Sequence, residues 1–258
     1  AINGGDTVSL GIALTTTGNN EGIDTNNVAN TDDGNTITVS ETGSITTGKG
    51  DLAVGIYNEG ASNKTTLSGS INTEGKFAAG IHNEGMDADT DTNHLNETTV
   101  TLSGRIKTTG DGAFGIYNEG NTNTTTVSGR IETTGATATD DGTAYGAYGI
   151  YNVGNKNKTT VTDSITTAGD AASGIYNKGD TNTTTLSGSI TTTGNILCNG
   201  GPSCSYYANG IYNEGNKNKT TVSGSITTGG TSALGIYNQG DDNETTVSGS
   251  ITTERSSA

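Results

Sequence analysis

The sequence is short of hydrophobic and bulky residues: it has no tryptophan and one proline, and only 28% of its 258 residues are hydrophobic. In bulk, this composition would be typical of a disordered chain. No apolar run approaches the roughly 20 residues of a membrane-spanning helix. No apolar residues recur at the i, i+3 and i+4 spacing of an amphipathic helix either. These deficits argue against helical folds and leave strands as the structure to expect.

Basic residues are also scarce, because 12 lysines and arginines stand against 27 acidic residues and leave a net charge of −15. Nucleic-acid binding requires a basic surface, so no nucleic-acid partner is expected. The same charge repels anionic membranes, and no direct membrane insertion is expected of this segment. The first residues, AINGGDT, are polar and show no signal peptide, which indicates a mature or excised segment.

What the sequence does have is an internal repeat rich in glycine, threonine, serine and asparagine. The unit is clearest in GIYNEGNKNKTTVSGSITTGGTSAL, residues 210–234. Its opening glycine recurs as Gly55, Gly80, Gly115, Gly149, Gly174, Gly210 and Gly235. Successive copies lie 25 residues apart, or 34 to 36 in three cases, and the additional residues fall at two fixed points of the unit. Insertions at fixed points are typical of solenoids, in which each copy forms one coil.

The repeat predicts an all-β chain folded as a single parallel β-helix, with about 25 residues per coil and insertions at two corners. Alternation with period 2 assigns the two faces of each strand. In one coil Leu67, Gly69 and Ile71 are expected to point inward, and Thr66 and Ser68 outward. The apolar residues, though few, would therefore gather in continuous columns along the axis of the stack.

The chain divides into two parts that form one continuous domain. Residues 1–54 resemble the repeat only in fragments, such as DTVSLGIALTTTG at 6–18, and are expected to form degenerate N-terminal coils or a cap. Residues 55–258 are expected to form the regular β-helix coils.

Two columns follow from the motif Gly-Ile-Tyr-Asn. The asparagines should form an inner ladder in which each amide bonds the next: Asn58, Asn83, Asn118, Asn152, Asn177, Asn213 and Asn238. The tyrosines should form an outward aromatic column: Tyr57, Tyr117, Tyr151, Tyr176, Tyr212 and Tyr237. Such a column suits sugar stacking or lateral self-association, and the flat threonine rows beside it are of a kind that binds ice. The alternative is that tyrosine and threonine are simply good strand formers that stack on themselves.

The repeats resemble those in the passenger domains of bacterial autotransporter surface proteins. GIYNEGNTNTTTVSGRIETTG (115–135) and GIYNKGDTNTTTLSGSITTTG (174–194) carry the resemblance best, and it covers roughly residues 35–253. It implies a parallel β-helix at the cell surface. It implies no particular activity, because such passengers include adhesins, self-associating proteins and some enzymes.

Two of the insertions contain candidate site residues. Cys198 and Cys204 are separated by five residues that include Gly-Gly-Pro, which favours a small disulfide-closed loop in an oxidising compartment over two free thiols. The insertion at 86–97 places oxygen-bearing side chains at alternate positions: Asp87, Asp89, Asp91 and Asn93. This spacing suits a Ca²⁺ loop, and the alternative is a solvated acidic loop. No other cofactor is expected.

An Asn-x-Thr sequon recurs at one corner of nearly every copy. Its asparagines are Asn63, Asn96, Asn123, Asn157, Asn182, Asn218 and Asn243. In an exported protein this pattern accepts N-linked glycans, which would form a stripe along the rod. The alternative is a turn asparagine copied with the repeat.

We therefore expect an extracellular, secreted structural or adhesive β-solenoid of a bacterial cell surface, mediating adhesion or self-association, and not an enzyme. Its expected partners are copies of itself, end to end or side by side, and host-cell or matrix glycans. The first alternative is a subunit of a secreted filament that polymerises by end-to-end stacking of coils. The second is an enzyme acting on polysaccharides, for which Arg105, Lys107, Arg130 and Glu132 on successive coils are the candidate residues. A charge cluster on a solvated face explains those four residues as well.

Overall fold

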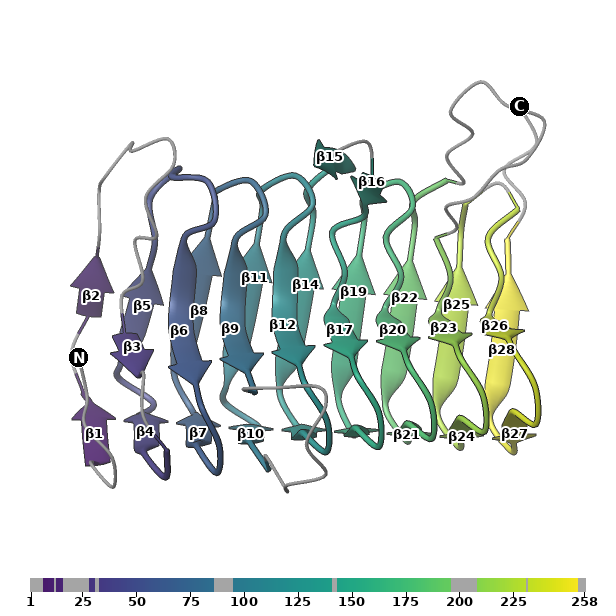
Figure 1. The fold of residues 1–258 in the computed structure, drawn as a ribbon. Helices are drawn as coiled ribbons and strands as arrows, with labels where there is room; N and C mark the ends of the chain where they lie inside the picture. The colour runs from purple at the N-terminus through teal and green to yellow at the C-terminus, as the bar shows by residue number, and fades with distance from the viewer. Residues whose placement is uncertain are drawn as a thin grey trace.

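The structure is a computed structural model, and it describes residues 7–11, 13–15, 28–30, 33–85, 95–140, 143–195, 208–230 and 232–254. Its regular elements are all strands, and most of them stack side by side into three long parallel sheets (Figure 1). This confirms the predicted parallel β-helix. No apolar helix of membrane-spanning length occurs in the part of the chain that the structure describes.

The three sheets are named A, B and C. Sheet A contains β3 (Val28–Asn30), β6 (Val54–Glu59), β9 (Ala79–Glu84), β12 (Phe114–Glu119), β17 (Ile150–Val153), β20 (Ile175–Lys178), β23 (Ile211–Glu214) and β26 (Ile236–Gln239). Sheet B contains β1 (Thr7–Leu10), β4 (Thr36–Val39), β7 (Lys64–Leu67), β10 (Glu97–Val100), β13 (Thr124–Val127), β18 (Lys158–Val161), β21 (Thr183–Leu186), β24 (Lys219–Val222) and β27 (Glu244–Val247). Sheet C contains β2 (Ala13–Thr15), β5 (Ser44–Thr46), β8 (Ser70–Thr73), β11 (Arg105–Thr108), β14 (Arg130–Thr133), β19 (Ser164–Thr167), β22 (Ser189–Thr192), β25 (Ser225–Thr228) and β28 (Ser250–Thr253).

Each coil runs through sheet B, then sheet C, then sheet A, and the next coil begins again in sheet B. Equivalent repeat positions lie opposite one another, as Ile116 does with Ile150 and Ile131 with Ile165. The degenerate first strands follow the same rule, since β1, β2 and β3 pair in parallel with β4, β5 and β6. Register is therefore set by the repeat, because a slip by one residue would turn every apolar side chain outward.

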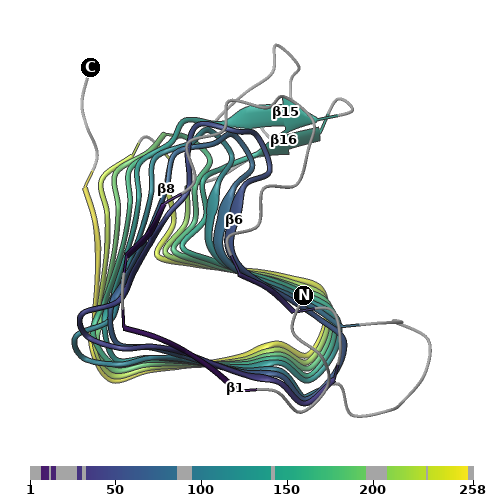
Figure 2. The ribbon, with the colours of Figure 1, turned by 90° about the vertical axis from the view of Figure 1, so that its left-hand side faces the viewer.

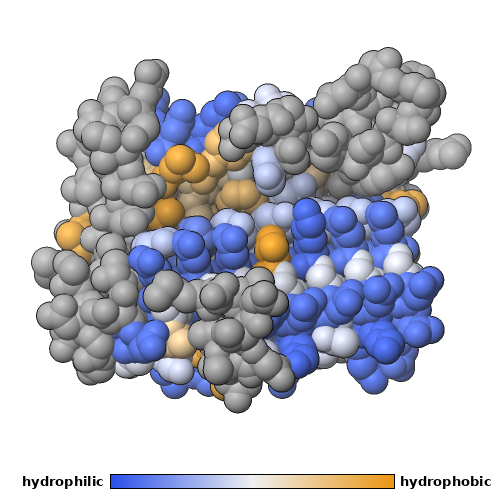
Figure 3. Space-filling view, in the orientation of Figure 1, coloured by the Kyte–Doolittle hydropathy of each residue, from blue (hydrophilic) through white to orange (hydrophobic). Residues whose placement is uncertain are grey.

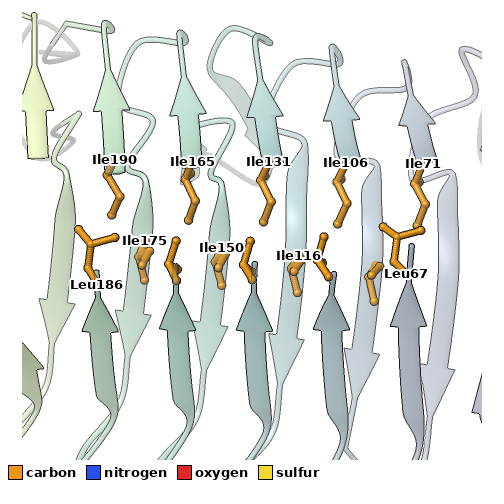
Figure 4. Close-up of a cluster of buried hydrophobic side chains, with 14 of the residues drawn as sticks. Leu67, Ile71, Ile106, Ile116, Ile131, Ile150, Ile165, Ile175, Leu186 and Ile190 are labelled. Carbon is orange, nitrogen blue, oxygen red and sulfur yellow. The ribbon is translucent and has the colours of Figure 1, made fainter. Parts of the chain in front are cut away.

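The core is a set of aliphatic columns inside the coil. Residues 63–75 alternate between buried and more exposed positions without a break, as the period-2 pattern predicted. The isoleucines of sheets A and C and the valine or leucine of sheet B point into one continuous interior (Figure 4). Ile116, Ile131 and Val127, one from each sheet, are fully buried. Burying such a side chain contributes about 1.5–3 kcal/mol, so a coil with few apolar residues still has a dry centre.

Buried polar ladders complete the interior. In the first ladder, Nδ2 of Asn118 donates to Oδ1 of Asn152 at 2.7 Å and to Oγ1 of Thr125 at 2.9 Å. The same 2.7 Å amide bond joins the other neighbours of this ladder, from Asn58 to Asn238. Because each buried amide finds partners in its own coil and in the next one, burial of these polar groups is compensated.

The corners explain where insertions are tolerated. Between sheets C and A one copy carries the antiparallel hairpin of β15 (Ala138–Asp140) and β16 (Thr143–Tyr145). The longest insertion, between β22 and β23, uses the same corner, and the insertion after β9 uses the corner between sheets A and B. Both fixed insertion points of the sequence are therefore corners of the coil, where extra residues leave the ladders intact.

Candidate binding groove on sheet A

The outer face of sheet A is concave. Viewed along the stack, sheet A bends inward and the hairpin β15–β16 projects beside it (Figure 2). The tyrosine column lies on this concave side, and His82 takes the tyrosine position in the coil of β9, with Tyr57 and Tyr117 as its register partners. Four of the column tyrosines lie outside the aliphatic core in a second cluster with Val54, Phe114 and Tyr148: Tyr57, Tyr117, Tyr151 and Tyr176.

The tyrosine column points away from the aliphatic core, but the second cluster covers much of its surface. Tyr151 is only 6% exposed, and Tyr57, Tyr117 and Tyr176 are partly buried against the cluster. The rings also stack on each other along the axis, with 4.5 Å between the centroids of His82 and Tyr117. Further along, Tyr176 and Tyr212 stack at 4.6 Å and an interplanar angle of 7°. Ring faces in this stack are occupied by neighbouring rings, so the column as a whole does not offer faces to sugars.

Glutamate side chains accept hydrogen bonds from phenol groups of the column. The hydroxyl of Tyr57 donates a hydrogen bond to Oε2 of Glu84, and that of Tyr117 donates to Oε2 of Glu119 at 3.0 Å. Burial, together with the Glu119 carboxylate, raises the pKa of Tyr117 well above its ordinary value. Burial likewise raises the pKa of Tyr151. Nε2 of His82 lies 4.0 Å from Oε2 of Glu119.

A second apolar column, which the sequence analysis did not identify, lies beside the rings. It consists of the residues that precede each opening glycine: Val54, Ala79, Phe114, Tyr148, Ser173, Asn209 and Leu234. The first four are apolar or aromatic and buried, whereas the next two are polar. A signal for it was present, because two aromatic residues, Phe114 and Tyr148, occupy this position in consecutive copies.

The groove widens into a cavity of about 330 Å³ over the coils of β6, β9, β12 and β17. Its floor is formed by Tyr57, His82 and Tyr117, and its rim by Leu52 and Phe77 from the corner between sheets C and A. The second strand of the hairpin adds Tyr145, whose ring meets that of Phe77 edge-on at 5.8 Å. Glu84 is its charged lining residue. Figure 3 shows apolar residues gathered on the upper part of this face, above a band of hydrophilic ones.

The sequon asparagines, which the sequence offered as glycan acceptors, form a second inner ladder. The first six, Asn63, Asn96, Asn123, Asn157, Asn182 and Asn218, are at most 1% exposed. The backbone N–H of Asn157 donates to Oδ1 of Asn182 at 2.8 Å, and Nδ2 of Asn157 donates to a carbonyl of the neighbouring coil at 3.1 Å. A glycan on such an Nδ2 atom cannot be accommodated unless the corner opens. Only Asn243, in the last described coil, is partly exposed.

The other candidate residues lie away from the groove or outside the described residues. Cys198, Cys204 and the loop with Asp87, Asp89, Asp91 and Asn93 are outside the described residues. No cluster of three or more metal-ligating side chains occurs in the ranges that the structure describes.

The charged residues proposed for an enzyme lie on sheet C, and Lys107 Nζ pairs with Glu132 Oε1 at 3.2 Å. Both side chains of this pair are substantially exposed, and Arg105 lies beside Arg130. This arrangement is a cross-strand charge cluster on a solvated face.

The fold places this chain in the class of three-sided parallel β-helices with an aromatic groove on one face. Comparison with family models, with curated proteins and with solved structures found no match for the chain.

Proposed function

We propose that this chain is an extracellular structural and adhesive β-solenoid of a bacterial cell surface, mediating adhesion or self-association. The observation that carries the proposal is the aromatic groove, an apolar hollow held open on the surface of a rigid stack. Exposed apolar hollows with a few polar groups are typical of binding sites. The likeness of the repeats to autotransporter passenger repeats supports the same function, and glycans of host cells or matrix are the partners that we propose.

Adhesion is tested with beads that carry the folded chain. Such beads should adhere to epithelial cells and to bacterial cells more than beads coated with the same chain after unfolding. The unfolded control has the same composition and charge, so any additional adhesion of the folded chain is due to its folded surface. Equal adhesion of the two kinds of bead would contradict the proposal.

A second candidate is end-to-end self-association, which the identical register of successive coils favours. Val247 is 42% exposed and Ile251 is 40% exposed, whereas their equivalents in the coil before are fully buried. β26, β27 and β28 carry the same repeat as the paired interior strands. We propose that strands of a second copy pair with them in the register that joins successive coils.

Sedimentation of the protein over a range of concentrations tests this second candidate. Val247→Lys with Ile251→Lys places charges on the edge and should shift assemblies to monomers. Thr246→Lys, which changes a neighbouring outward residue, should not. A wild-type chain that remains monomeric at all concentrations would exclude end-to-end assembly.

A further inference from the structure

We infer that the cavity on sheet A is a binding slot for an extended glycan that carries no anionic groups. This inference rests on the proposed adhesive function and names the ligand class of its groove. It is carried by the shape of the slot, the chemical groups that line it, its charge, and the size of its rim residues.

The slot is long in the direction of the rod. Its lining comes from four successive coils, from Tyr57 through His82 and Tyr117 to Tyr151. Three steps of about 4.8 Å between stacked strands give a length on the order of 14 Å. One coil step is close to the length of one sugar ring in an extended chain, so about three rings fit along the slot. A compact ligand would contact only one or two of these coils.

The lining groups suit a glycan better than a peptide. A peptide gains affinity in a groove by adding a strand to a free sheet edge. Here the floor strands are paired on both sides, because β9 lies between β6 and β12, and β12 between β9 and β17. Their backbone groups are therefore not free to bind a strand. What the slot offers instead is ring surface at Phe77 and Tyr145, phenol groups, and the Glu84 carboxylate as an acceptor for hydroxyl groups.

The charge of the slot excludes anionic glycans. Glu84 lines it, and Glu119 adjoins it through the bond with Tyr117. Neither lysine nor arginine is among the lining residues that the structure describes. Lys76, with Nζ 5.0 Å from the centre of the Phe77 ring, is the cation beside the rim. Because the chain as a whole carries a net charge of −15, sulfated or carboxylated chains are repelled.

The rim differs from the same corner of other coils in the size of its residues. Leu52 and Phe77 adopt left-handed backbone conformations, with φ of 60° and 54°. This conformation is unfavourable for bulky residues. At the same corner other coils use Gly112, Ala171 and Ser232, which are smaller. Leu52 remains 50% exposed, so its burial in the chain does not compensate for the strain. A left-handed conformation recurs at other corners, as at Lys156 and Thr181, so it does not by itself mark the slot. What is particular to the rim is that two large apolar residues occupy that conformation beside the cavity.

The test measures binding of fluorescently labelled hexasaccharides to the full chain by polarisation. The probes are cellohexaose, the hexamers of β-1,4-linked N-acetylglucosamine and of glucosamine, and a heparin hexasaccharide. At least one of the first three should bind, and heparin should not. In the double variant Leu52→Asn/Phe77→Asn that binding should weaken by about tenfold or more. Asparagine adopts the left-handed conformation readily, so this variant removes the apolar rim without harming the fold.

The matched control is Thr181→Asn/Ser232→Asn, which makes the same change at two exposed left-handed positions outside the slot. It should bind as the wild type does, and thermal unfolding of all three proteins verifies that they are folded.

Binding of heparin as tight as that of the other probes overturns the charge argument and the inference with it. So does the absence of binding to all the probes, or equal loss in both double variants. Preferential binding of a hexalysine peptide would assign the slot to a basic peptide instead. If beads still adhere to cells while no glycan binds, the adhesive function stands and only the inference fails.

Discussion

Nδ2 of Asn118 donates a hydrogen bond to Oδ1 of Asn152 across 2.7 Å, and the two residues occupy the same position in successive coils. Asn118 in turn accepts a hydrogen bond from Asn83. One side chain therefore links three coils inside the stack, and its removal leaves buried donors and acceptors without partners on both sides.

The ladder predicts that Asn118→Ala lowers the free energy of unfolding by about 2–4 kcal/mol, because buried polar groups on either side lose their partners. Asn238→Ala removes the equivalent residue from the last described coil, where the side chain is exposed, and should cost less. Urea denaturation of the two variants measures the difference. Equal losses would show that the ladder contributes no more inside the stack than at its edge.

The aliphatic columns predict a position-dependent cost for one substitution. Ile131 is fully buried and Ile251, in the same column of sheet C, is 40% exposed. Ile131→Ala should destabilise the chain by ~2–5 kcal/mol, from lost burial and the cavity that remains. Ile251→Ala should have a clearly smaller effect. Thermal unfolding compares them, and a similar shift in both would contradict the burial of this column.

The opening glycines predict that even one methyl group is too large at their positions. A Cβ on Gly149 would lie 2.4 Å from Cγ2 of Ile165 and 2.6 Å from the carbonyl oxygen of Gly174. Gly149→Ala should therefore separate two coils and cost about 1–3 kcal/mol or more. A Cβ on Gly229 has its nearest neighbour at 3.7 Å, so Gly229→Ala should be tolerated. Hydrogen exchange of sheet A would localise the damage in the first variant.

The tyrosines of the groove predict instability in alkali. The pKa values of Tyr117 and Tyr151 are raised in the folded chain, first of all by burial. Their contribution to stability is fully present below the ordinary pKa of about 10, because the phenols are then neutral in both states. As the pH rises above that value, the unfolded chain releases protons that the folded chain retains, and the free energy of unfolding falls.

Urea denaturation between about pH 8 and pH 11 measures this fall. Tyr117→Phe and Tyr151→Phe, singly and together, should make the curve flatter above pH 10. A curve of unchanged slope in the double variant would show that these phenols are not the groups responsible.

The sequence by itself determined the architecture. Gly-Ile-Tyr-Asn and Thr-Thr-Val-Ser-Gly-Ser-Ile recur with fixed spacing, so their register, their inward columns and the corners that accept insertions follow from counting. Period-2 alternation placed Leu67 and Ile71 inside, and stacking of identical positions placed Asn118 beside Asn152. A repeat of this kind predicts which residues are neighbours, because each residue lies against the equivalent residue of the next coil.

Only the tertiary structure decided how residues of different columns contact one another and how deeply they are buried. Whether Tyr151 is exposed depends on how sharply sheet A bends and on what stands beside it, and no repeat spacing contains that information. The sequon residue Asn157 is buried because the chain turns inward at its corner, although the same motif suits an exposed turn. The slot itself combines Leu52 and Phe77 with Tyr145 from a hairpin that occurs only once. It arises where departures from the repeat meet in space, and only the folded chain brings them together.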